Sequence, residues 1–455
     1  MQTNFKLDRI KLIHWLNIRK ITVDKFLSDC KLEPTIYDLK KDCDYIETTQ
    51  SKIEKITEFL SVKEEQLEYS KANYDEDGYI YQTKDELHKT KRLIKRDGLD
   101  FYNYYTLPSP EGHVAPVILD ILCPSNKLPK LNNGHFESAI TINLGPGPIN
   151  GRWGEEINEL NFSILDSNSD KETNWITGAS YFEPSYCPHT YSLATNRPAK
   201  ILSYTVANTL DNFLSRINSF SKDQQTNYED SLDKPLIERT IFNQMSLLGF
   251  TAKTLADNSK VDFDVVKSFI NADFSNLSIE TIKEICSHLN LDYRVLLLPA
   301  ITGDSLGKTT FSIDKSLETK RFFKNIEWAS AASSINSPDL TGSFMRVQDN
   351  RREIDLKEDD FFYFSKNSHY LVTSGSVSFL SKDSKGKVNK LGLNEEDSLW
   401  VKPFQSHSFI GKGNLIKMSN GEGVEYTNDF SFGNLFNEHV TMKRAFQDNL
   451  DWGYD

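Results

Sequence analysis

Two stretches of the chain carry the same helical pattern of apolar positions. Apolar residues recur at spacings of three and four in residues 17–27 and 53–67, and again in residues 246–256 and 282–296. This spacing is typical of short amphipathic helices that pack together in a small bundle. One constant offset of 229 positions relates both pairs of segments, and such a constant offset is hard to obtain by chance. The pattern therefore predicts two copies of a small helical unit.

Each predicted unit has the order short helix, threonine, helix, turn, helix. Thr22 and Thr251 stand at matching positions, and each is expected to cap the helix that follows it. The order resembles the helix-turn-helix of small repressors, so a transcription regulator with a ligand-sensing β domain is one interpretation. DNA binding requires a basic recognition face, whereas residues 34–42 mix acidic and basic side chains.

After each helical unit the pattern changes to short runs of β-branched and aromatic residues, which glycine and proline interrupt. The runs predict strands at residues 101–107, 114–122, 139–144, 201–206, 361–364, 370–373, 377–380 and 399–401. Many short strands between turn signals are typical of a barrel or jelly roll. Residues 68–92 and 215–234 are charged and polar, and this composition predicts connectors.

The predicted fold class is α+β, with a small helical domain and a β-barrel that occur twice in tandem. The expected domains are a helical domain with its connector at residues 1–92, a first barrel at 93–212, a second helical domain with its connector at 213–310, and a second barrel at 311–455. A chain of 455 residues is long enough to give each of these units a core of its own.

Composition narrows the class of protein. The net charge of −12 disfavours nonspecific binding to nucleic acid or to an anionic membrane. No apolar run approaches the roughly 20 residues that span a bilayer, and the first residues lack the apolar core of a signal peptide, so we expect a cytoplasmic protein. The five cysteines are scattered and form no CxxC motif, which predicts reduced thiols.

Two histidines and one carboxylate stand out within the first strand-rich region. His135 follows an Asn-Asn-Gly turn, and Glu183 and His189 lie six positions apart. Pro184 and Pro188 argue against a helix between them, so the two side chains are expected to meet across a turn between strands. Two imidazoles and one carboxylate are the ligand set of a non-haem Fe(II) site, which leaves coordination positions open for substrate and O2.

Other interpretations of these residues remain open. A histidine beside a strand is more often a packed or surface residue than a ligand. His135 and Glu137 also have the His-x-acid spacing of many oxoglutarate-dependent oxygenases, so Glu137 competes with Glu183 for the ligand role. Cys187 lies between two candidate ligands, although packing is its simpler role.

The second strand-rich region carries an altered copy of the same residues. His369 and His407 match the two histidines of the first region, whereas Lys402 stands at the position of Glu183. An ammonium group repels a divalent metal and cannot coordinate it while protonated. We therefore expect the first barrel to bind metal and the second barrel to bind none.

Several residues near the predicted metal site are suited to an anion. Arg96 precedes a tyrosine-rich run at residues 101–105, and guanidinium and phenol groups donate directional hydrogen bonds to an oxyanion. A surface ion pair beside an aromatic core is the alternative. Lys20 has Gly249 as its counterpart, so this cation occurs only in the half with the complete ligand set.

Together these segments resemble the family of 2-hydroxyethylphosphonate dioxygenases. The resemblance is densest in residues 95–205 and extends to residues 452–455 at the end of the chain. It rests on Lys20, Arg96, the runs at residues 101–105, 132–135, 143–147 and 150–156, and the run from Glu183 to His189.

The resemblance implies a fold, a metal site and a reaction. It implies tandem helical and cupin domains, and Fe(II) held by His135, Glu183 and His189. It also implies phosphonate contacts from Lys20, Arg96, Tyr104 and Asn132, with Lys20 and Tyr104 in catalytic roles. The implied reaction uses O2, without 2-oxoglutarate, to cleave the carbon–carbon bond of 2-hydroxyethylphosphonate into hydroxymethylphosphonate and formate.

The resemblance extends to a related activity. Methylphosphonate synthases act on the same substrate, and some members of the group place glutamine at the carboxylate position, so Glu183 favours the dioxygenase. A metal isomerase or epimerase that does not use O2 is a further alternative, which oxygen uptake would distinguish. The expected partner is a small phosphonate, with no nucleic acid and no membrane, and a homo-oligomer is left open.

Overall fold

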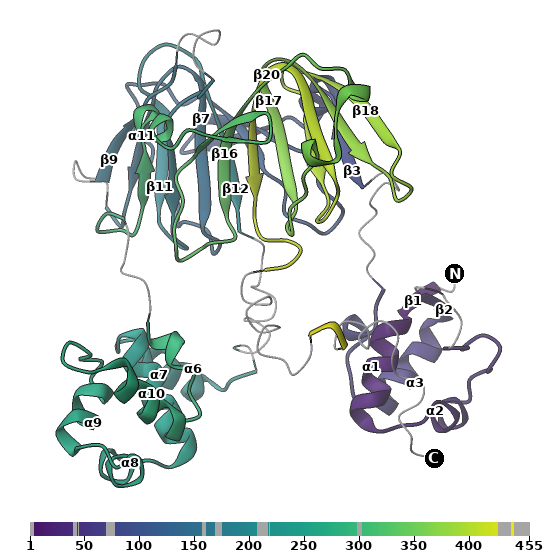
Figure 1. Ribbon diagram of the computed structural model, residues 1–455, viewed down its shortest axis with the longest axis vertical. Helices are drawn as coiled ribbons and strands as arrows, with labels where there is room; N and C mark the ends of the chain where they lie inside the picture. The colour runs from purple at the N-terminus through teal and green to yellow at the C-terminus, as the bar shows by residue number, and fades with distance from the viewer. Residues whose placement is uncertain are drawn as a thin grey trace.

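The structure is a computed structural model. It describes residues 4–39, 43, 45–69, 78–156, 161–168, 175–206, 217, 219–297, 303–425 and 438–440, so residues 452–455 lie outside the described part. Two separate helical units lie below one large body of sheets (Figure 1). No helix in the described ranges is long and apolar enough to cross a membrane. The cysteines are free thiols.

The N-terminal helical unit packs around one apolar core that includes Leu12, Phe26 and Ile53. The side chain of Thr22 accepts a hydrogen bond from the backbone N–H of Lys25, which confirms the predicted N-cap. The unit consists of β1 (Asn4–Asp8), α1 (Arg9–Arg19), α2 (Val23–Asp29), β2 (Tyr45–Thr49), α3 (Gln50–Leu60) and the short 3₁₀ helix η1 (Glu64–Gln66).

The second helical unit has its own core, which includes Ile241, Leu255 and Ile285. Thr251 caps its helix as predicted, by accepting a hydrogen bond from the backbone N–H of Thr254. The helices are α6 (Lys222–Ser231), α7 (Leu236–Leu248), α8 (Ala252–Ser259), α9 (Phe263–Ile270), α10 (Ile279–His288) and η3 (Tyr293–Leu296).

The first strand-rich region folds as a sandwich. A seven-stranded sheet in the order β13-β10-β7-β12-β6-β5-β4 and a three-stranded sheet in the order β11-β8-β9 enclose a core that contains Trp153, Tyr181 and Tyr191. The elements are β4 (Arg92–Arg96), β5 (Leu99–Thr106), β6 (Val117–Ile121), β7 (Ala139–Pro146), β8 (Ile149–Trp153), β9 (Phe162–Leu165), β10 (Ser180–Glu183), β11 (His189–Leu193) and β12 (Ala199–Thr205).

The second strand-rich region forms an eight-stranded sheet in the order β14-β15-β16-β20-β17-β19-β3, with β18 paired to β17. Its own core includes Phe379 and Phe409. The elements are β14 (Arg321–Phe323), β15 (Ile326–Ser330), β16 (Thr341–Asp349), η4 (Glu353–Asp355), η5 (Glu358–Asp360), β17 (Ser368–Lys382), β18 (Val388–Asn394), β19 (Ser398–Val401) and β20 (His407–Ser419).

Three details of the predicted strands are wrong. The sheets do not close into barrels: β7 ends at Pro146, and Pro148 precedes β8, so the corner between them lacks the backbone N–H groups that would continue one ladder. Residues 370–373 and 377–380 belong to one strand, β17, that bends at Gly375 with φ of 76°. Residues 361–364 contribute a single bridge, from Phe362, in place of a strand.

The two halves of the sheet body exchange strands. The first exchanged strand lies within residues 68–92, which the composition predicts as a connector, and the other predicted connector, residues 215–234, contains helix α6. Strand β3 (Tyr79–Gln82), followed by α4 (Lys84–Lys89), precedes the first sandwich but pairs with β19 of the second half. Strand β13 (Thr309–Phe311), followed by α11 (Ile313–Glu318), precedes the second sheet but pairs with β10 of the first half. One apolar core joins the halves, with Ile140 and Phe182 from one and Phe344 from the other.

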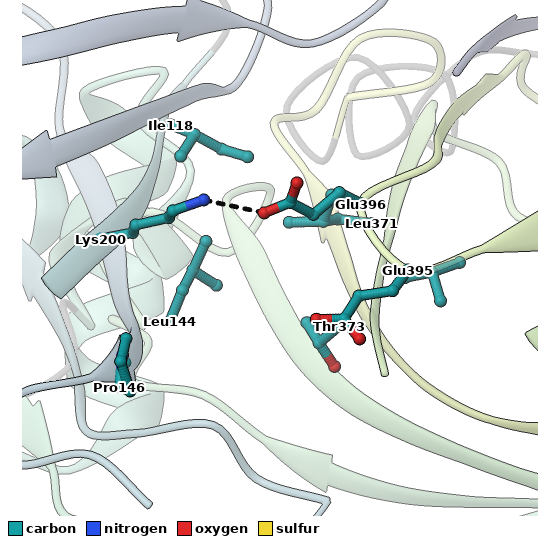
Figure 2. A pocket seen from close by; sticks show the side chains of 10 residues that line it. Ile118, Leu144, Pro146, Lys200, Leu371, Thr373, Glu395 and Glu396 are labelled. Carbon is teal, nitrogen blue, oxygen red and sulfur yellow. Dashed lines mark hydrogen bonds and ion pairs between the residues drawn. The ribbon is translucent and has the colours of Figure 1, made fainter. Parts of the chain in front are cut away.

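A polar contact also joins the halves, at the edge of a cavity lined by Ile118, Leu371 and Thr373 (Figure 2). Glu396, between β18 and β19, accepts a hydrogen bond from Nζ of Lys200 on β12 at 2.8 Å. The same carboxylate lies 3.0 Å from the ammonium of Lys84 and 3.1 Å from the ring of His88, both on α4. Burial alone would raise the pKa of Glu396, but these groups outweigh burial and lower it to about 2.

This contact predicts how stability depends on pH. Because the pKa of Glu396 is depressed on folding, its stabilisation is present above about pH 4.5 and is lost as the pH falls toward about 2. Glu396→Gln is expected to lower the free energy of unfolding by roughly 1–3 kcal/mol at pH 7. Urea unfolding of both proteins at pH 7 and near pH 3 would test this. If the difference in the free energy of unfolding between wild type and Glu396→Gln does not shrink at the lower pH, the prediction is wrong.

Candidate metal centre

Three strand ends place the predicted ligands together. His135 lies four positions before β7, Glu183 ends β10, and His189 begins β11. Glu183 pairs with Ala139 at the start of β7, which brings the carboxylate to the loop that carries His135. One ligand atom from each of the three residues lies within 4.8 Å of the others. In the described ranges, no other group of three or more His, Cys, Asp or Glu residues meets this criterion.

His135 is oriented by its own loop. Its Nδ1 lies 2.5 Å from the carbonyl oxygen of Glu137, and its Nε2 lies 3.2 Å from Oε1 of Glu183. In this arrangement Nδ1 carries the ring proton and donates it to the carbonyl oxygen, which leaves Nε2 unprotonated and directed toward Glu183. Burial disfavours the imidazolium form, but the Glu183 carboxylate and the Glu137 carbonyl outweigh burial and raise the pKa of His135.

Asn132 ties the two ligand loops together. Its Oδ1 accepts hydrogen bonds from the backbone N–H groups of His189 at 2.7 Å and Gly134 at 2.9 Å. Its Nδ2 lies 2.9 Å from Nε2 of His189. Gly134 has φ of 74°, and a Cβ atom there would stand 2.6 Å from the backbone of Tyr186, so only glycine allows the loops to approach this closely.

The carboxylate of Glu183 is held from behind by aromatic side chains. Glu183 is 1% exposed. The indole N–H of Trp153 donates to its Oε2 at 3.0 Å, and Trp153 stands opposite His189 in the pairing of β8 with β11. The hydroxyl groups of Tyr181 and Tyr191 bond to each other beside Trp153, in a wall that excludes water from this side.

The structure decides between the competing ligands. Glu137 contributes its backbone carbonyl to His135, and its carboxylate is not part of the cluster formed by Glu183 with the two histidines. The carbonyl oxygen of Cys187 lies 3.1 Å from Nδ1 of His189. Burial and the nearby Glu183 charge raise the pKa of the Cys187 thiol to about 11, so it stays protonated and packs.

The two histidines of the second half lie on different strands, His369 on β17 and His407 at the start of β20, and their side chains lie on opposite faces of the sheet. His369 and Tyr370 are neighbours on β17, so their side chains lie on different faces. Nε2 of His369 lies 3.0 Å from the hydroxyl of Tyr204 in the first half. Nε2 of His407 lies 2.7 Å from the hydroxyl of Tyr370. These two histidines are therefore not arranged to share a metal ion.

Arg96 and Tyr104 lie on the strands beside the ligand loops. The guanidinium of Arg96 donates to the carbonyl of Lys130, two positions before Asn132, and lies 5.1 Å from the ring centre of Phe101. Tyr104 packs against the core that contains Trp153 and Cys187. Burial raises the pKa of the Tyr104 phenol although Arg92 opposes the shift, so the hydroxyl stays a hydrogen-bond donor.

The structure does not bring Lys20 to this cluster. Lys20 is the C-cap of α1, with a left-handed backbone at φ of 57°. In Figure 1 the helical unit that contains α1 lies at the lower right, whereas β7 and β11 lie in the upper left part of the sheet body. Helix α1, which Lys20 caps, thus lies apart from the strands β7 and β11 beside the predicted ligands.

The donor set fits a divalent iron ion. Two imidazoles and one carboxylate are the ligands of non-haem Fe(II) oxygenases, and three protein ligands leave positions open. A carboxylate as buried as Glu183 requires compensating positive charge, which a metal ion between the three side chains would supply. The hydrogen bonds that Trp153, Glu137 and Asn132 make to the ligands match the supporting contacts that orient metal-binding side chains.

Sequence reasoning did not assign a role to Trp153 or to Arg92. Trp153 lies in the glycine-rich run at residues 150–156. Buried and less buried positions alternate along β8, and Trp153 is one of the buried positions, so this alternation is the signal that could have identified it. The guanidinium of Arg92 lies 4.4 Å from the ring centre of Tyr104, a contact between neighbouring strands that local sequence does not indicate.

Comparisons with known proteins identify relatives of the whole chain. The family model of the 2-hydroxyethylphosphonate dioxygenase cupin-like domain matches residues 88–206. A 2-hydroxyethylphosphonate dioxygenase from Streptomyces viridochromogenes is 36% identical over 99% of this chain and 100% of its own length. A methylphosphonate synthase from Nitrosopumilus maritimus is 23% identical over 88% of this chain and 86% of its own.

Solved structures of similar proteins also cover almost the whole chain. A structure of PhpD with cadmium, complexed with hydroethylphosphonate, is 35% identical and covers 97% of this chain and 100% of its own, with a TM-score of 0.83. The Streptomyces albus enzyme with 2-hydroxyethylphosphonate and Fe(II) bound has a TM-score of 0.77 at 17% identity, which shows a shared fold. It covers 97% of this chain and 98% of its own.

Proposed function

Because the chain belongs to the family of 2-hydroxyethylphosphonate dioxygenases, we propose that it is an Fe(II)-dependent oxygenase that acts on 2-hydroxyethylphosphonate. The substrate and O2 are converted to hydroxymethylphosphonate, formate and a proton, so the substrate supplies all the electrons and 2-oxoglutarate is not needed. The observation that carries the proposal is the cluster of His135, Glu183 and His189 inside the region that the family model matches.

The metal ligands are His135, Glu183 and His189. Bound Fe(II) supplies the activation of O2 and a site that chelates the substrate. The protein holds each ligand in place: the Glu137 carbonyl fixes the ring of His135, and Trp153 fixes one oxygen of Glu183. The aromatic wall behind Glu183 keeps water from that side of the site, which strengthens electrostatic interactions there.

Arg96, Tyr104 and Asn132 bind the phosphonate in this proposal. Arg96 and Asn132 lie on adjoining segments, since the guanidinium of Arg96 bonds to the loop that leads into Asn132. Tyr104 offers a protonated phenol, which suits donation to a phosphonate oxygen. Because a phosphonate dianion lies beside the open metal positions, fixed cations and phenols hold it without reorganisation.

We assign catalytic roles to Tyr104 and Lys20. Tyr104 is partly buried against the core of the sandwich, and its hydroxyl can hold the substrate in one orientation while the bond is cleaved. Lys20 lies apart from the ligands of its own chain, so its role requires a neighbouring chain, and a homo-oligomer is part of this proposal. The expected setting is cytoplasmic, without nucleic acid or membrane partners.

The tandem arrangement also belongs to this proposal. The offset of 229 positions that relates the helical units in sequence recurs in their left-handed backbone positions, which pair Lys20 with Gly249 and Ser61 with Asn290. We take the second helical unit and the second sheet as a duplicated copy, with domains at residues 1–92, 93–212, 213–310 and 311–455. In this interpretation the second copy is degenerate and binds no metal.

Phosphorus NMR tests the function directly. Purified protein with Fe(II), 2-hydroxyethylphosphonate and O2 is expected to produce hydroxymethylphosphonate, with matching formate and oxygen consumption. Methylphosphonate would instead identify a synthase, the activity named for the relative at 23% identity. Unchanged substrate on iron-loaded protein would contradict both activities.

A further inference from the structure

A strand from the second half lies against the strand that carries the metal-binding carboxylate. Strand β13 is the edge of the seven-stranded sheet, and it pairs with β10 through Phe182 and Thr309. Lys308 directly precedes β13 and Glu183 directly follows Phe182, so one further step of this antiparallel register would place Lys308 opposite Glu183. Residues that stand opposite each other in a sheet project to the same face, so Lys308 reaches the side of the sheet on which the ligands lie.

Lys308 is a buried cation with defined partners. It is 6% exposed, and lysine is rarely buried unless it is paired. Its Nζ lies 3.1 Å from Oδ2 of Asp304 and donates to the hydroxyl of Thr310 at 3.1 Å. The same ammonium lies 4.7 Å from the ring centre of Trp153. The aromatic ring is thus the third partner of this charge.

Trp153 links Lys308 to the metal ligand. Its indole N–H donates to Oε2 of Glu183 at 3.0 Å, and Trp153 itself is fully buried. A cation above an indole ring draws electron density from it, which makes the N–H a stronger donor to a carboxylate. The hydrogen bond in turn leaves Oε1 of Glu183 directed toward His135. Such supporting contacts orient ligands and tune the metal that they hold.

We propose that Lys308 is a positioning residue of the metal centre, which acts through Trp153 on Glu183. This inference rests on the metal site of the proposed function. Asp304 balances the charge of Lys308, so the ammonium adds no net positive charge near the metal. The second half of the chain, although its own histidines are separated, therefore contributes to the metal centre of the first half.

The experiment measures the dissociation constant for Fe(II) by anaerobic titration calorimetry on the full chain. Lys308→Met is expected to weaken Fe(II) binding by up to roughly 10-fold, the lower end of the effect of losing a contact that supports a metal ligand, because Lys308 acts on Glu183 through Trp153. Lys308→Arg keeps a cation that stacks on aromatic rings and is expected to stay within about threefold of wild type. Lys417→Met is the matched control, because Lys417 is 8% exposed and lies 4.3 Å from the ring centre of Phe364 in the other half.

A double-mutant cycle separates this role from simple packing. Trp153→Phe keeps a ring but removes the indole N–H, so Lys308→Met should cause no further loss of Fe(II) affinity in that background. A loss that persists there, or wild-type affinity in Lys308→Met alone, would overturn the inference. If Lys308→Met strongly lowers the Tm of the metal-free protein, the same titration is made with Lys308→Gln, which can still donate to Thr310. The Fe(II) affinity of that variant then decides whether Lys308 acts on the metal centre.

The wild-type chain distinguishes this inference from the proposed function. Fe(II) binding by wild type together with equal binding by the Lys308 variants would overturn only the role of Lys308. Failure of wild type to bind Fe(II) would overturn the proposed function and, with it, this inference.

Discussion

Glu183→Ala is expected to abolish Fe(II) binding and turnover, because the substitution removes the one anionic ligand of the cluster and leaves two neutral imidazoles. The loss should exceed the roughly 100-fold that is typical of removing an outer contact. Iron content after anaerobic reconstitution, followed by turnover of 2-hydroxyethylphosphonate, measures both effects. The residual cluster of His135 and His189 cannot supply the charge that a divalent ion requires.

Lys402→Ala is the matched control for that result. Lys402 is the residue that the sequence aligns with Glu183 in the second half, where His369 on β17 and His407 on β20 contact different tyrosine hydroxyls and are not arranged to share a metal ion. Its removal should leave iron content and turnover unchanged. Equal loss of iron in Glu183→Ala and Lys402→Ala would refute the prediction that only the first half of the chain binds metal.

Arg96→Ala is expected to raise the KM for 2-hydroxyethylphosphonate roughly 10- to 100-fold, with a smaller change in kcat. A charge-assisted hydrogen bond to a phosphonate contributes about 1.5–3 kcal/mol, which corresponds to this change in binding. Steady-state kinetics with saturating O2 gives both constants. The substitution also removes the hydrogen bond from the guanidinium to the carbonyl of Lys130 in the ligand loop.

Lys95→Ala controls for a general change in surface charge. Lys95 is the preceding residue on β4, and its side chain is 69% exposed beside Asp100. Its KM should match that of wild type. An unchanged KM in Arg96→Ala would exclude Arg96 from the substrate site.

The ligand set was predictable because its chemistry is local in sequence. Glu183 and His189 flank a short turn marked by two prolines, and the structure places them at the ends of consecutive strands, β10 and β11, which belong to different sheets. The choice between Glu183 and Glu137 required the fold. Only the pairing of β10 with β7 shows that Glu183 faces His135, because strand register is not encoded in one segment.

The contacts between the halves were not predictable from local patterns. Strand β3 lies in a polar stretch that resembles a connector, strand β13 is only three residues long, and the partners of both lie far away in sequence. Lys308 gave no signal in the sequence for the same reason. Glycine beside serine and threonine at Gly375 predicts a turn between two strands, whereas β17 continues through this position with a positive φ.

The exchange of β3 and β13 sets an order for folding during synthesis. The ribosome synthesises β10 long before β13, so the edge of the first sheet at β10 stays uncovered until residue 311 has been synthesised and β13 can pair with it. Strand β3 waits longer still, for β19 at residues 398–401. An uncovered strand edge is a site for misassociation between nascent chains. Expression of either half alone should therefore give aggregation-prone protein, and the two halves are best regarded as one folding unit.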